Sequence, residues 1–216
     1  MFSHAALFFG VALLYALVGF GGGSSYTALL FLFGLPYALI PTISLLCNLI
    51  VVSGGSWHFC RQGHYVPRLF WPFALSSVPM AFVGGLLPIG KELFLLLLGL
   101  SLFCAGLRLL WVETAAQGRE TALPPVPLAL LIGAVLGLLS GLVGIGGGIF
   151  LAPLLLNLGW GRPKQVAATA SLFILVNSLA GLLGQWLKQG NFADILPYWP
   201  LLLAVLLGGQ FGSRLG

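Results

Sequence analysis

Two glycine clusters interrupt long apolar stretches of this chain, and they constrain its fold more than any other feature. The first is Gly19-Phe20-Gly21-Gly22-Gly23, and the second is Gly144-Ile145-Gly146-Gly147-Gly148. Each glycine weakens a helix by about 1 kcal/mol relative to alanine, and in lipid a broken helix has no water to satisfy its backbone groups. Such breaks are stable only where protein surrounds them or where they line a cavity. Matching breaks in the two halves of a chain are typical of a transporter's binding site.

The composition predicts an integral membrane protein. Hydrophobic residues make up 59% of the sequence and charged residues only 6%, with a mean hydropathy of +1.09, whereas a soluble domain has about 25% charged residues. No charged residue precedes Arg61, and later charge-free intervals are long enough to span a membrane. We therefore predict an all-α polytopic membrane protein whose net charge of +5 comes from Lys and Arg that flank its spans. Because there is no basic run, nucleic acid is not a predicted partner.

Apolar periods and turn residues divide the chain into an ordered series of helical segments. The first glycine cluster breaks a segment at about 5–33, and the second breaks one at about 126–158. Unbroken helices are predicted at about 38–58, 67–87, 91–112, 165–187 and 196–215. The hydrophilic stretch 113–124 separates the two sets.

The two halves match beyond the glycines. Thr42-Ile43-Ser44-Leu45 corresponds to Thr169-Ala170-Ser171-Leu172 at a shift of 127 residues, and Trp71-Pro72 corresponds to Trp199-Pro200 at a shift of 128. An ordered series of matches indicates duplication. We predict a first membrane repeat at 1–112, a polar linker at 113–124 and a second repeat at 125–216, each repeat with one broken segment and about three transmembrane helices.

The repeat also predicts a missing element. Gly84 in the first half is followed by the helix at 91–112, but its counterpart Gly212 is followed only by the last four residues of the sequence. We therefore expect the last helix of the second repeat to be absent from this chain.

Positive charge distinguishes two topologies for the broken segments. If each segment crosses the membrane once, the nine Lys and Arg residues divide five to four between the two sides. If each segment is a re-entrant hairpin, they divide seven to two, with only Lys91 and Lys188 on the minor side. The second arrangement fits the positive-inside rule better. It also leaves an odd number of spans per repeat, which makes the repeats inverted, as in many secondary transporters.

The predicted substrate-binding residues form two groups. The breaks themselves offer backbone N–H groups, hydroxyls and the partial positive charge of a helix N-terminus, which together suit an anion; their residues are Gly21, Gly22, Gly23, Ser24, Ser25, Gly146, Gly147 and Gly148. We expect the two serines to cap the helix that follows them. The helices after the breaks add neutral polar groups, namely Ser44, Asn48, Thr169, Ser171 and Asn177. The alternative is that these small and polar residues serve helix packing alone.

Other chemistry has little support in the sequence. His58 is a candidate for proton exchange near neutral pH, although its place beside Trp57 near a helix end equally fits an interfacial position. His58, Cys60 and His64 have no partner cluster, so we predict no metal site. A phosphate-binding GxxxxGK[ST] motif is absent, and no catalytic constellation or cofactor motif is found. We predict that the protein is not an enzyme and has no cofactor.

Three segments of the chain carry a family resemblance, namely GFGGGSSYTALLFLFGLP, GLVGIGGGIFLAPLLLNLGW and, after the second, ATASLFILVNSLAGLLG. They resemble the sulfite exporter TauE/SafE family, also called the 4-toluene sulfonate uptake permease family. The likeness covers nearly the whole chain. It implies a multi-pass carrier of a bacterial-type inner membrane, whose substrate is sulfite, a sulfonate or a related organosulfur anion.

The resulting hypothesis is a secondary transporter that works by alternating access. The two breaks hold a small sulfur oxyanion between helix N-termini and backbone N–H groups, because such an anion accepts several hydrogen bonds. A channel, a carrier for another small anion such as a carboxylate, and a membrane protein in which the glycines serve only packing remain as alternatives.

Overall fold

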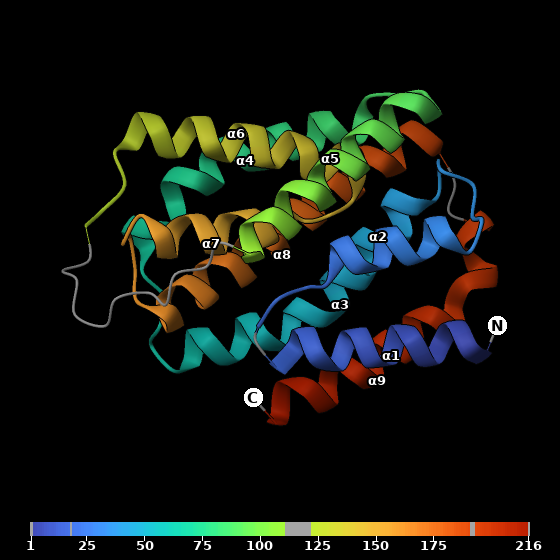
Figure 1. The fold of residues 1–216 in the computed structure, drawn as a ribbon, viewed down its shortest axis with the longest axis horizontal. Helices are drawn as coiled ribbons and strands as arrows, with labels where there is room; N and C mark the ends of the chain where they lie inside the picture. The colour runs from blue at the N-terminus through green and yellow to red at the C-terminus, as the bar shows by residue number, and fades with distance from the viewer. Residues whose placement is uncertain (1, 18, 111–121, 191–192, 216) are drawn as a thin grey trace.

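The computed structural model describes residues 2–17, 19–110, 122–190 and 193–215, and every regular element in these ranges is a helix (Figure 1). The elements are α1 (Phe2–Leu17), α2 (Gly23–Leu32), α3 (Ile40–Arg61), α4 (Pro67–Leu86), α5 (Lys91–Leu110), α6 (Val126–Val143), α7 (Gly148–Asn157), α8 (Pro163–Gln189), the 3-10 helix η1 (Ala193–Tyr198) and α9 (Trp199–Leu215). The predicted all-α class is confirmed for this part of the chain. Most of the predicted linker, 113–121, lies outside the described residues.

Five of the described helical stretches are long and apolar enough to span a membrane, namely α3, α4, α6, α8 and the continuous stretch Ala193–Leu215. Shorter apolar helices lie at His4–Leu17, Gly23–Leu32 and Gly148–Asn157. The prediction of a multi-pass membrane protein is therefore confirmed. The sequence analysis did not predict the 3-10 helix η1, which lies just before the last helix. Asp194 lies in its first turn, and Pro197 within it has no backbone N–H to donate.

The chain reverses direction at each glycine cluster, so α1 and α2 form one hairpin and α6 and α7 form another (Figure 1). In the first hairpin, the His4 ring near the start of α1 stacks on Phe33 just after α2, with ring centroids 3.7 Å apart. Near the turn, the hydroxyl groups of Tyr15 and Ser25 lie 3.0 Å apart in a hydrogen bond. In the second hairpin, Ala129 of α6 belongs to the same buried cluster as Trp160, which follows α7.

Positive backbone φ angles produce these reversals. Gly19 and Gly22 have φ values of 77° and 78°, and Gly144, Gly146 and Gly147 have values of 85°, 84° and 75°. Any residue with a Cβ is strained in this left-handed region, by about 1–2 kcal/mol. The glycine clusters are therefore required by the local fold and are more than helix-packing residues.

Glycine also brings whole helices into contact. On α6, a Cβ added to Gly137 or Gly141 would collide with the backbone of Ser77 or Ala81 on α4. On α9, a Cβ at Gly212 would collide with the Leu13 carbonyl of α1. Small residues at such crossings let helices in a membrane approach closely. The resulting bundle holds α3 and α8 in its interior, where most of the buried polar groups lie.

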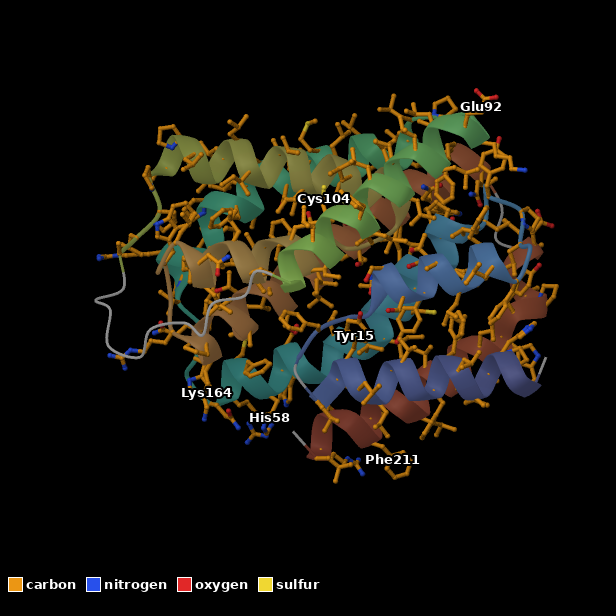
Figure 2. The ribbon with its side chains drawn as sticks, viewed as in Figure 1. Tyr15, His58, Glu92, Cys104, Lys164 and Phe211 are labelled. Carbon is orange, nitrogen blue, oxygen red and sulfur yellow. The ribbon has the colours of Figure 1, made fainter. Side chains whose placement is uncertain are left out.

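The two ends of the bundle differ in charge. Glu92 lies at one end, whereas His58 and Lys164 lie together near the other (Figure 2). The direction of each helix places the described Lys and Arg residues at one end of the bundle or the other. The end that holds His58 also has Arg61, Arg68, Arg162, Lys164 and Arg214, whereas the opposite end has Lys91 and Lys188.

Candidate functional site

The two glycine breaks meet at the side chain of Asn48 on α3. A Cβ built on Gly21 would lie 2.6 Å from the Asn48 Oδ1 atom, and a Cβ built on Gly146 would lie 2.8 Å from its Nδ2 atom. A Cβ on Gly23 would collide with the same amide and with the Ile145 carbonyl oxygen. Asn48 therefore fills the space that glycine leaves open in both breaks, although the breaks are separated by more than a hundred residues in sequence.

Asn48 has an environment that stability alone does not favour. Its side chain is 0% exposed, and neither Nδ2 nor Oδ1 has a hydrogen-bond partner among the described residues. A buried polar group without a partner costs about 1–3 kcal/mol. Such a buried amide offers both a donor and an acceptor, which is a suitable arrangement for a ligand that brings its own polar atoms.

Ser44, one turn before Asn48 on α3, bridges the two breaks. Its Oγ atom lies 3.0 Å from the Gly23 carbonyl oxygen and 2.8 Å from the Gly144 carbonyl oxygen, so its single proton is within reach of either acceptor. Thr27 of α2 also donates to the Gly23 carbonyl oxygen at 2.7 Å, and it lies 2.9 Å from the Ser44 Oγ atom. This small network ties the end of α6 to the beginning of α2.

Both returning helices begin at the breaks with unblocked N-termini. The N-cap residues are Gly22 for α2 and Gly147 for α7, both left-handed, and neither helix has a side-chain cap. The first-turn N–H groups of such a helix have no intrahelical acceptor, and they give this end a partial positive charge.

The prediction that Ser24 and Ser25 cap this helix is wrong. The helix starts at Gly23, earlier than expected, so both serines lie inside its first turn. Ser25 instead bonds to the Tyr15 hydroxyl, across the hairpin. Glycine takes the N-cap position because the backbone there has a φ of 78°.

The second break is the more apolar of the two. A Cβ on Gly147 would lie 2.9 Å from a ring carbon of Phe173, and a Cβ on Gly148 would collide with the Ile174 side chain. The Ile174 Cγ2 atom also approaches the Cβ positions of Gly21 and Gly146, at 3.1 and 3.0 Å. The apolar Ile174 side chain of α8 and the Asn48 amide of α3 therefore approach the same glycines.

The other predicted site residues lie on α8 and are fully buried. The Ser171 Oγ atom is 2.9 Å from that of Ser56 on α3, and a Cβ at the neighbouring Gly55 would lie 3.5 Å from Ser171 and 3.7 Å from the Cα atom of Gly19. Thr169 and Asn177 are 0% exposed and have polar atoms that find no hydrogen-bond partner in the described part of the chain. No described contact brings these two to the breaks, so their role in binding stays a prediction.

His58 is exposed and is not part of the buried site. Its Nε2 atom lies 2.7 Å from the Nε2 atom of Gln62, one turn later on α3. In the described part of the chain, no group of three His, Cys, Asp or Glu side chains is placed to hold a metal ion.

Sequence reasoning missed several residues at this site, namely Tyr15, Thr27, Ser56 and Ile174. Thr27 had a usable signal, because it is a polar residue on an apolar helix one turn after the glycines. The role of Ile174 had none, because it depends on how α8 crosses both breaks.

A helical membrane bundle whose broken helices meet in its interior around uncharged polar groups has the architecture of a membrane transporter. The sequence profile described as "Sulfite exporter TauE/SafE" matches residues 4–216. The chain belongs to this family of membrane transporters.

Relatives extend this assignment. A "Probable membrane transporter protein y4hK" of Sinorhizobium fredii (strain NBRC 101917 / NGR234) is 37% identical over 220 residues, which is 98% of this chain and 86% of that protein. "Probable membrane transporter protein YunE" of Bacillus subtilis (strain 168) is 33% identical over 41% of this chain and 30% of its own length. "Sulfite exporter TauE/SafE family protein 1" of Arabidopsis thaliana is 44% identical over 31% of this chain and 14% of its own length. No solved structure gives a significant match.

Proposed function

We propose that this protein is a secondary transporter of small sulfur oxyanions, such as sulfite or a sulfonate, in a cell inner membrane. The observation that carries the proposal is the Asn48 side chain, which is fully buried, lacks a hydrogen-bond partner and lies between two glycine breaks. Membership of a family named for sulfite export supports the choice of substrate.

The chemistry of the site suits an oxyanion. Sulfite and sulfonate groups each present three oxygen atoms that accept hydrogen bonds. The Asn48 Nδ2 atom and the first-turn N–H groups of α2 and α7 are donors, and both helix N-termini favour negative charge. These groups replace the hydration of the anion without a cationic side chain, so the bound ion is held by dipoles and can also leave.

The hairpins support an inverted-repeat mechanism. Of the described Lys and Arg residues at helix ends, Arg61, Arg68, Arg162, Lys164 and Arg214 share one side. Under the positive-inside rule this side faces the cytoplasm, and α1–α2 and α6–α7 are then re-entrant hairpins. The repeats at 1–112 and 125–216 would rock about the breaks to expose the anion to one side and then to the other.

Counterflow in proteoliposomes tests the proposal. Vesicles loaded with unlabelled sulfite should accumulate labelled sulfite transiently, and external sulfonates should compete more strongly than acetate. Uptake that never saturates and shows no counterflow would identify a channel instead. Equal competition by acetate would contradict the sulfur-oxyanion assignment while leaving a carrier in place.

A further inference from the structure

A second polar feature lies outside the buried site, at the end of the bundle that holds His58 and Lys164 (Figure 2). It is a cavity of about 130 Å³ formed by the ends of α1, α3 and α9 and the start of α8. Its polar lining comes from His58, Gln62, Lys164 and Ser213, and its apolar lining includes Phe59. A cavity of roughly 150 Å³ holds a molecule as large as benzene, so sulfite or a small sulfonate fits this one.

The lining of the cavity is suited to an anion. Lys164 contributes an ammonium group, while His58 and Gln62 contribute side-chain nitrogen atoms that lie 2.7 Å apart. Among the described residues, no acidic side chain lines the cavity. The described acids Glu92 and Asp194 stand at the other end, in the first turns of α5 and η1. A concave site lined by one sign of charge raises the local concentration of ions of the opposite sign.

The cavity lies next to the first glycine break. Gly55 lines it, and a Cβ there would lie 3.7 Å from the Cα atom of Gly19 and 3.5 Å from the Oγ atom of Ser171. Phe59 also lines it, and its ring lies directly against Gly19, where an added Cβ would be 2.8 Å from the ring Cζ atom. One aromatic ring and one small residue thus separate the cavity from the break.

We propose that this cavity is a second binding subsite, which captures a small oxyanion through Lys164, with His58 and Gln62 as further polar contacts, before the anion passes Phe59 to the buried site at Asn48. The inference rests on the proposed function, because it assigns the route to the same buried site. It places one cationic side chain, Lys164, outside a buried site that holds its anion by dipoles alone.

Sulfite uptake into sealed membrane vesicles of both orientations tests the subsite. In Lys164→Gln, the KM for sulfite should rise about fivefold from the side that bears the cavity, as expected for one partly exposed ion pair. The maximal rate and the KM from the other side should stay unchanged. Lys164→Arg should restore the KM, and Arg68→Gln, which removes an exposed cation at the same end but outside the cavity, should have no effect.

Each outcome decides the matter. An unchanged KM in Lys164→Gln, an equal rise from both sides, or an equal effect of Arg68→Gln would overturn the subsite while leaving the transporter intact. Absence of saturable sulfite uptake by the unaltered protein would instead overturn the proposed function, and the subsite with it. Higher salt should raise the KM of the unaltered protein more than that of Lys164→Gln, because salt screens exposed charges.

Discussion

The helices that follow the two breaks, α3 and α8, have corresponding sequences but different surroundings. On α3, Ser44 and Asn48 reach both breaks through polar atoms. On α8, the side chain that reaches both breaks is Ile174, which offers only hydrocarbon. The polar groups that contact the two breaks therefore come mainly from α3 and not from α8.

The far ends of the same two helices differ as well. His58 and Gln62 on α3 correspond to Gln185 and Gln189 on α8 at a shift of 127 residues. The side chains of the α3 pair bond to each other, with no further partner among the described residues, and line the cavity. The α8 pair bonds to other helices and loops, since Gln185 donates to the Gly141 carbonyl at 3.2 Å and Gln189 to the Ala38 carbonyl at 2.9 Å.

We call the end of the bundle that holds His58 and the cavity the open end, and the end at which Gln185 and Gln189 bond to neighbouring segments the sealed end. Equivalent polar pairs face a cavity in one half and cross-link neighbouring segments in the other. Variants of α3 and α8 should therefore differ in sulfite affinity, sulfite flux and local stability.

The largest effect is expected where the second break meets α3. In Gly146→Ala, the new Cβ would be 2.8 Å from the Asn48 Nδ2 atom, on a backbone with a φ of 84°. Left-handed strain of about 1–2 kcal/mol and overpacking of about 1–3 kcal/mol then add, and sulfite flux should be lost. Thermal unfolding and proteoliposome flux are the measurements.

Gly159→Ala is the matched control for this change. Gly159 also has a positive φ, of 68°, but nothing lies within 4 Å of an added Cβ. It should show the strain without the loss of flux. If both variants lose flux equally, backbone strain and not contact with Asn48 is the cause.

The second prediction separates Asn48 from Asn177. Asn48→Leu removes two unpartnered buried polar atoms, so the substrate-free protein should become more stable by about 1–3 kcal/mol. The same change should weaken sulfite binding about 10- to 100-fold, the equivalent of one hydrogen bond to a charged group. Calorimetric titration in detergent and thermal unfolding measure the two effects.

Asn177→Leu tests the α8 side of the comparison. Its amide is equally buried and equally without a partner, so a similar gain in stability is expected. Because no described contact brings it to the breaks, its effect on sulfite affinity should be smaller than that of Asn48→Leu. An equal loss of affinity would show that both halves contact the anion and would remove the asymmetry.

Much of this fold could be predicted from the sequence, because hydrophobic length and turn residues act locally. The bounds of α4, at Pro67–Leu86, are nearly those expected from the apolar run and from Pro88-Ile89-Gly90. The start of α2 differs from the expectation, because serine is a common cap but is strained at the left-handed angle that Gly22 adopts.

The candidate site was predicted only in part. Glycine clusters and buried polar residues can be recognised in a sequence, and Asn48, Ser44 and the breaks were found in this way. That Asn48 lies between Gly21 and Gly146 depends on how α3 crosses two distant hairpins, which no local pattern encodes. The cavity beside Lys164 likewise requires the ends of four helices to be placed together.

The smallest effect is expected at the sealed end. Gln189→Ala removes the hydrogen bond to the Ala38 carbonyl and a weaker one to the Thr42 Oγ1 atom at 3.3 Å. The bond to the Ala38 carbonyl contributes about 1 kcal/mol and the longer one little, so amide exchange in the segment 35–42 should be roughly fivefold faster through local opening. Hydrogen exchange with mass spectrometry measures it.

Gln62→Ala is the matched change at the open end. Gln62 bonds only to His58 on its own helix, so its loss should leave exchange at the start of α3 unchanged and affect only the cavity. If both glutamine variants accelerate exchange in the segment 35–42 equally, the contacts of Gln189 do not stabilise the sealed end. If Gln189→Ala alone accelerates exchange and sulfite flux also changes, opening of the α8 end would be a step in transport.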